Sequence, residues 1–117
     1  MKKVEELGDA LVEFMSKRKR GISFADINKF FAQQGIDYKG EQALTMTEYP
    51  SIIYWANWNE LAVNAYLYMT DKLKIEMTSC SELVYIADGM LPKMAIAKSI
   101  RNYQSNRWLP VVMEVVA

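Results

Sequence analysis

The spacing of apolar residues predicts an amphipathic helix at the start of the chain. Over residues 3–18, large hydrophobic side chains recur three and four positions apart, which is the period of an α-helix with one buried face. The apolar stripe consists of Val4, Leu7, Leu11, Phe14 and Met15. Acidic residues come early in this segment and basic residues late, which complements the helix dipole.

A second helix is predicted in the segment SFADINKFFAQQG. Ser23 is a good N-cap, and Asp26 at the third helical position completes a variant of the capping box. Gly35 then provides a left-handed stop at the C-terminal end. The predicted buried face consists of Ile27, Phe30 and Phe31.

Two β-hairpins are predicted where the pattern changes to β-branched and aromatic residues or to alternation. The first has strands over residues 42–47 and 52–55, around the turn EYPS. The second has strands over residues 74–78 and 82–87, because Ile75 and Met77, and then Leu83 and Tyr85, alternate with other residues.

Between the hairpins, residues 57–73 are predicted to form a third helix, capped by Asn57 or Asn59. Its broad apolar face indicates a central core helix. After the second hairpin we expect a short helix near residues 93–103. A closing strand is expected from Val111.

The chain of 117 residues, of which 51% are hydrophobic, is long enough for one domain with a real core. We therefore predict a single α+β domain over residues 1–117, with a core at about 3–89 and a basic C-terminal extension, 90–117, packing on it. No apolar run approaches the ~20 residues that span a bilayer, so no membrane partner is expected. The early acids Glu5, Glu6 and Asp9 interrupt any apolar leader. A single cysteine, Cys80, suits a reducing compartment, so we expect a cytoplasmic protein.

Enzyme activity is not expected. The chain has no histidine, which removes the commonest general base, the commonest zinc ligand and every nucleophile that depends on a histidine. The carboxylates show no catalytic or calcium-loop spacing, and the five glycines form no phosphate loop. Cys80, in TSCSE, has no neighbouring base and is expected to be an exposed turn thiol. We expect no catalytic residue, metal, cofactor or small-molecule substrate.

The charges sum to zero but are unevenly distributed. Two segments contain bases and no acid, and they flank an acidic middle. The candidate nucleic-acid-binding residues are Lys17, Arg18, Lys19, Arg20, Lys93, Lys98, Arg101 and Arg107.

Each basic segment also has a purely structural interpretation. Bases at a helix C-terminus satisfy its carbonyl groups and its dipole. In the second segment, Tyr103 and Trp108 either stack on bases or anchor the tail to the core. If the two segments meet in space, they form one patch of eight cations.

The polar face of the third helix is the other candidate surface. Asn59 and Asn64 could contact bases, but Glu60 and Asp71 on the same face would repel phosphate, and arginine is absent. This favours a core role over a DNA-reading role. The edge that remains open to a partner consists of Asn59, Val63, Asn64 and Leu67. Alternatively, another segment covers its apolar residues.

The order of predicted elements resembles a winged-helix domain over Lys3–Gly89. GISFADINKFFAQQGI is similar to the second helix of that family, and NWNELAVNAYLYMTDKLKIEMTSCSELVYIADG is similar to its third helix and wing. A hairpin separates these helices here, whereas the family has a short turn or one strand. The whole chain, including its ending RNYQSNRWLPVVMEVVA, resembles small uncharacterised proteins of phages and prophages of low-GC Gram-positive bacteria.

Two functions follow as expectations. The first is a non-enzymatic nucleic-acid-binding accessory or regulatory protein of phage type, with DNA as its partner. The alternative is a protein-interaction module on a winged-helix scaffold that does not bind DNA, in which the acidic middle and the Val63/Leu67 edge contact another protein or a second copy.

Overall fold

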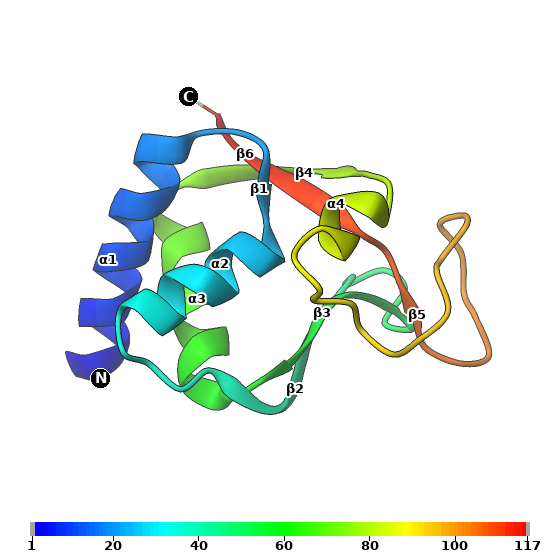
Figure 1. The fold of residues 1–117 in the computed structure, drawn as a ribbon. Coiled ribbons are helices and arrows are strands. Elements are labelled where there is room, and N and C mark those ends of the chain that lie inside the picture. Colours follow the sequence, from blue (N-terminus) through cyan, green and yellow to red (C-terminus); the bar gives the residue numbers. More distant parts are fainter. Residues whose placement is uncertain (1, 117) are drawn as a thin grey trace.

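The three longer helices lie together on one side of the molecule. The structure, a computed structural model, describes residues 2–116. Figure 1 shows α1 (Lys2–Arg18), α2 (Phe24–Gln33) and α3 (Glu60–Lys72) gathered on one side, with most of the strands extending away from them. The fold is α+β. None of the helices in the described residues is both long and apolar enough to cross a membrane.

The local signals that predict α2 and α3 are confirmed. The Ser23 Oγ accepts a hydrogen bond from the Asp26 N–H at 3.1 Å, and the Ser23 N–H donates to the Asp26 carboxylate at 3.0 Å, which completes the capping box. Gly35 has a φ of +71° just after α2, as a left-handed stop requires. Asn59, with its side chain bonded to the Ala62 N–H, is the N-cap of α3.

The first predicted hairpin is confirmed and is longer than expected. It consists of β2 (Lys39–Thr45) and β3 (Ile52–Trp58), paired antiparallel with irregular register. A short strand, β5 (Arg107–Trp108), adds to β3 in parallel, so this sheet has the order β2-β3-β5.

The second predicted hairpin is wrong in one of its two strands. β4 (Lys74–Ser79) forms as expected, but Leu83–Ile86 is a short helix, α4. β4 pairs instead with β6 (Val111–Val116), in a register that sets Met77 opposite Met113. The β-branched sequence of β6 is better suited to a central strand than residues 82–87 are.

The closing strand from Val111 is confirmed, but it does not merely pack on a finished core. β6 lies between β1 (Ile22–Ser23) and β4 in the order β1-β6-β4. It is therefore the middle strand of a sheet that includes Ser23, the N-cap of α2. The helix expected near residues 93–103 is absent, and that segment is an irregular loop (Figure 1).

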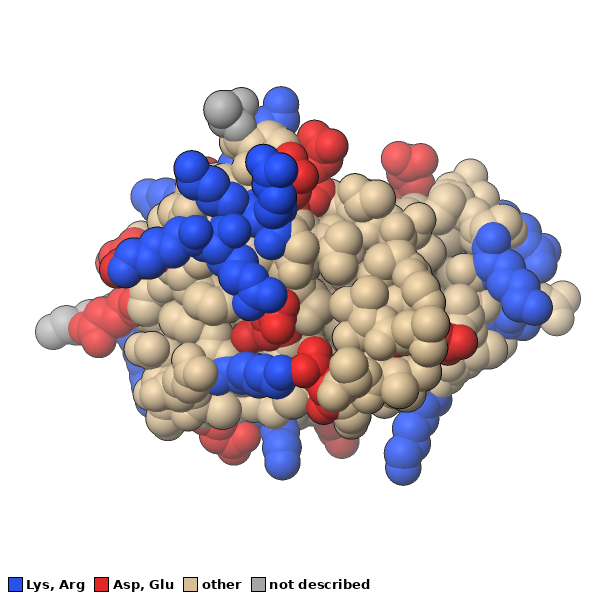
Figure 2. Space-filling model, turned by 45° about the horizontal axis from the view of Figure 1, so that its top comes forward, with Lys and Arg blue, Asp and Glu red and all other residues tan. Residues whose placement is uncertain are grey.

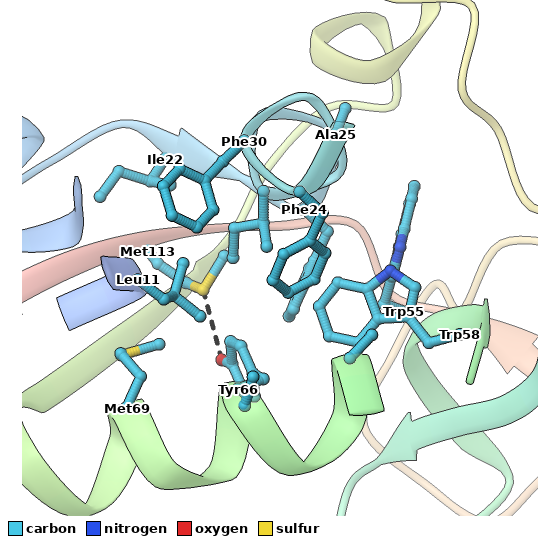
Figure 3. Close-up of a cluster of buried hydrophobic side chains, with 14 of the residues drawn as sticks. Leu11, Ile22, Phe24, Ala25, Phe30, Trp55, Trp58, Tyr66, Met69 and Met113 are labelled. Atoms are coloured by element: carbon cyan, nitrogen blue, oxygen red, sulfur yellow. Dashed lines mark hydrogen bonds between the residues drawn. The ribbon is translucent and has the colours of Figure 1, made fainter. Parts of the chain in front are cut away.

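The core joins the helices to both sheets. The ring of Phe24 lies 5.7 Å from Trp55, 5.8 Å from Trp58 and 5.4 Å from Tyr66, centre to centre. Figure 3 shows these rings together with Met113, whose sulfur accepts a hydrogen bond from the Tyr66 hydroxyl at 3.3 Å. Aromatic packing of this kind adds to the burial of apolar area. It fixes α2, α3 and both sheets in one arrangement.

Candidate nucleic-acid interface

The first basic segment lies at the C-terminal end of α1, and acids neutralise half of it. The Lys17 ammonium lies 2.8 Å from Glu13, and the Arg18 guanidinium lies 3.2 Å from Asp26. The hydrogen bond between Lys17 and Glu13 lowers the pKa of Glu13 and raises that of Lys17. These two cations therefore have structural partners that compete with any phosphate.

Lys19 and Arg20 are exposed, and within residues 2–116 neither forms a salt bridge. Lys19 has a φ of +68°, in the left-handed region that reverses the chain after α1. Its carbonyl oxygen accepts a hydrogen bond from the Val115 N–H at 2.6 Å, which ties this turn to β6. The backbone at Lys19 therefore has a structural role, while its side chain stays free.

The second basic segment is a loop that a tyrosine hydroxyl closes. The Tyr103 hydroxyl accepts hydrogen bonds from the N–H groups of Lys98 and Ser99, both at 3.1 Å, and donates to the Ser99 carbonyl at 2.9 Å. The Tyr103 N–H donates to the Ser51 Oγ at 3.0 Å, which fixes the loop to the start of β3.

Two arginines share the ring of this tyrosine. The guanidinium carbon of Arg101 lies 4.5 Å from the centre of the Tyr103 ring, and that of Arg107 lies 4.9 Å from it. Arg107 also donates a hydrogen bond to the Ile96 carbonyl at 3.4 Å, and its buried Nε has no partner within the described chain. The Tyr103 ring therefore contacts both guanidinium groups.

The hollow beside this arginine pair is polar and is lined by no acid. No acid occurs between Gly89 and Met113. A hollow of about 410 Å³ beside the pair is lined by Arg101, Asn102, Tyr103, Gln104, Ser105 and Arg107. These side chains offer guanidinium, amide and hydroxyl donors and no carboxylate. Such a set of groups suits an anion.

Hydrogen bonding also changes the acidity of Tyr103. The bond with the Ser99 side chain, followed by those with the Ser99 backbone and Arg101, lowers the pKa of Tyr103 to about 8. Deprotonation would put a negative charge close to both guanidinium groups.

The two basic segments do not meet. In Figure 1 the end of α1 and the loop before β5 lie at opposite ends of the molecule, and Figure 2 shows blue groups at both ends with an uncharged area between them. The eight cations of the two segments therefore do not form a single patch. Lys93 is exposed but does not line the hollow that Arg101 and Arg107 share.

Trp108 anchors the chain and is not available to stack on a base. Only 1% of its surface is exposed, and its indole N–H donates to the Tyr54 carbonyl at 3.2 Å. The structure therefore supports the anchoring interpretation for this residue. Tyr103 already has two guanidinium groups over its ring.

The candidate edge of α3 is largely structural. Asn59 caps the helix, and its side-chain amide donates to the Asp37 carbonyl at 2.6 Å. Val63 is only 9% exposed and belongs to the core, whereas Leu67 is 48% exposed and Asn64 partly exposed. The exposed apolar pair expected from Val63 and Leu67 is therefore not formed, because Val63 turns toward the core.

Cys80 also differs from its prediction. It follows β4 instead of forming a hairpin tip, and its N–H donates to the Pro110 carbonyl at 2.9 Å. The thiol is partly buried, and burial raises its pKa, which makes the reactive thiolate rarer.

An apolar surface around α4 is not predicted by the sequence pattern. Of the six exposed large hydrophobic side chains in residues 2–116, five fall in one short part of the chain. They are Leu83, Val84, Ile86, Leu91 and Ile100. Alternation assigns Leu83 to the buried face of a strand, whereas the structure places it in α4. The density of apolar residues in SELVYIADGML was the available signal.

Comparison of the chain with protein-family models, with curated proteins and with solved structures gives no match.

Proposed function

We propose that the protein is a non-enzymatic nucleic-acid-binding accessory or regulatory protein of phage type that acts in the cytoplasm. Its contact with nucleic acid is the loop that holds Arg101 and Arg107 over Tyr103. The observation that carries this proposal is the pairing of two guanidinium groups on one ring, in a hollow without acids.

Phosphate is the ligand group that best fits this loop. Arginine presents a planar fork of N–H donors that matches phosphate oxygens. Arg101 and Arg107 line the same hollow, so together they can hold one phosphate or two successive ones. Phosphate contacts carry no base information. Because the Tyr103 ring is occupied and Trp108 is buried, base stacking is not part of the proposal. The expected binding is therefore largely independent of sequence.

The winged-helix interpretation of the fold belongs to the same proposal. Its support is the order of the elements: β4 follows the third helix and pairs antiparallel with β6, while β1 lies between α1 and α2. In this interpretation β4 and β6 are the wing strands, and the segment between them is a greatly enlarged wing loop. That segment contains the Arg101–Arg107 hollow.

The test compares two double variants that remove equal charge from opposite ends of the molecule. One replaces Arg101 and Arg107 with Gln, and the matched control replaces Lys19 and Arg20 with Gln. Binding to a labelled mixed-sequence duplex and to a single strand is followed by fluorescence anisotropy, at low and at physiological salt.

We expect the loop variant to bind at least about tenfold more weakly, because two phosphate contacts are lost, and the control to stay close to wild type. Absence of binding by the wild type even at low salt would refute the function. An equal loss in the two variants would refute the assignment to the loop.

A second candidate function is a protein-interaction module, and the apolar surface around α4 favours it. Clustered exposed apolar side chains are typical of partner surfaces. Affinity capture from cells that express the protein tests this candidate. A specific partner should be lost with Ile86→Asp and retained with Leu67→Asp, because Leu67 is exposed on a different helix.

A further inference from the structure

A groove runs beside α4, between two segments that are distant in the sequence. One wall consists of residues 79–82, the other of residues 96–100, and Leu109 and Pro110 complete the lining. The groove has a volume of about 430 Å³. We call it the α4 groove.

The rims of the α4 groove are apolar on both sides. Leu83, 68% exposed, follows directly after the first wall, and Ile100, 52% exposed, belongs to the second wall. Val84 and Ile86 continue the apolar surface along α4. The uncharged area in Figure 2 lies over the part of the molecule that α4 occupies in Figure 1. Covering such exposed apolar side chains with a partner lowers the free energy of the complex.

The two walls carry opposite charges. Glu82 belongs to the first wall and Lys98 to the second, and each is exposed. Neither side chain forms a salt bridge within residues 2–116. The other polar residues that line the groove are the uncharged Ser79, Ser81 and Ser99, besides Cys80.

We infer that the α4 groove is a homodimer interface, occupied by the same groove of a second copy. A two-fold axis that runs along the groove turns the first wall of one copy onto the second wall of the other. Glu82 then faces Lys98 of the second copy, and Leu83 faces its Ile100, twice in each dimer. An interface of this symmetry requires a surface that is complementary to itself.

The charge pattern favours a second copy over a different protein. An acidic wall and a basic wall on one groove match each other after the two-fold rotation, without any further charge from a partner. The net charge of zero means that two copies do not repel each other at long range. This inference rests on the second candidate function, because it names the partner for that apolar surface.

The first measurement is the molecular mass of the full chain by sedimentation equilibrium over a range of concentrations. We expect the wild type to form dimers, Leu83→Asp to be a monomer, and the control Leu67→Asp to dimerise as the wild type does. Circular dichroism confirms that each variant is folded. A monomeric wild type at all concentrations would overturn the inference, as would a Leu67→Asp variant that loses the dimer along with Leu83→Asp. Neither result affects the capture experiment, which tests the second candidate function separately.

Charge exchange tests the symmetry itself. Glu82→Lys alone sets lysine against lysine twice, and Lys98→Glu alone sets acid against acid twice, so each variant should dimerise more weakly than the wild type. A mixture of the two variants should form heterodimers, because each heterodimer contains one native and one reversed ion pair. Failure of the mixture to associate better than either variant alone would contradict the two-fold arrangement.

Discussion

At the scale of single residues, the position of Tyr85 shows what alternation can and cannot predict. Alternation identifies Tyr85 as a buried residue, which is confirmed, but assigns it to a strand, which is wrong. Its hydroxyl accepts a hydrogen bond from the Phe24 N–H at 3.0 Å and donates to the Val111 carbonyl at 2.7 Å. Both partners are distant in the sequence. No local pattern indicates such contacts.

Tyr85→Phe should therefore cost more stability than its small size change suggests. Removal of the hydroxyl leaves the Phe24 N–H and the Val111 carbonyl unpaired in the core, and we expect a loss of about 1–3 kcal/mol in the free energy of unfolding. Tyr66→Phe is the matched control, because that buried hydroxyl donates only to the Met113 sulfur, a weak acceptor. Urea unfolding of both variants measures the difference. Equal losses would contradict the bridging role of Tyr85.

Tyr103 should ionise near pH 8, well before the other tyrosines with shifted pKa values. Hydrogen bonds with Ser99 lower its pKa from 10.0 to about 8, whereas burial raises the pKa values of Tyr66 and Tyr85. Folding thus favours the phenolate, and the folded state gains stability as pH rises from about 8 toward 10.

Ultraviolet absorbance during a pH titration detects the phenolate directly. The step near pH 8 should disappear in Tyr103→Phe and persist in Tyr68→Phe, which removes a tyrosine of α3 whose hydroxyl donates to Asp9 of α1. Persistence of the step in Tyr103→Phe would show that another group causes it. The affinity of the wild type for nucleic acid should also fall as pH rises through this step, because the new charge offsets Arg101 and Arg107.

At the scale of elements, local signals predict the first three helices and the first hairpin. The capping box of α2 and the glycine after it act within a few residues, so the sequence identifies both ends of this helix. The pairing of β4 is different, because the choice between residues 82–87 and Val111–Val116 depends on the whole fold. The β-branched residues of β6 occupy the central position in the sheet, and residues 83–86 form α4 instead.

The packing of α1 on α3 depends on the absence of a side chain at Gly8. A Cβ added there would overlap the Tyr68 ring, at 2.8 Å from its Cγ atom. Gly8→Ala should therefore destabilise the protein by about 1–3 kcal/mol through overpacking. The same change in an isolated helix would be favourable by about 1 kcal/mol.

A double-mutant cycle separates these two effects. In a Tyr68→Ala background the clash is removed, so Gly8→Ala should become stabilising by about 0.5–1 kcal/mol. Urea unfolding of the four proteins measures the reversal of sign. A loss of similar size in both backgrounds would show that the close contact of Gly8 with Tyr68 is not the cause.

At the scale of the whole molecule, the position of charge could not be predicted. The sequence identifies two basic segments correctly, but only the fold shows that they lie at opposite ends and that Glu13 and Asp26 pair with Lys17 and Arg18. The candidate site is consequently smaller than the eight residues proposed from the sequence. Its geometry, two guanidinium groups on one ring, depends on contacts within an irregular loop that no periodicity describes.

The salt dependence of single-strand binding tests this account most directly. Each phosphate that a cation neutralises adds about −0.7 to the slope of log affinity against log salt concentration for a single strand. Contact through Arg101 and Arg107 predicts a slope of about −1.4. A slope near −6, the value expected for about eight contacts, would contradict the separation of the two basic segments, and no measurable binding would contradict the proposed function.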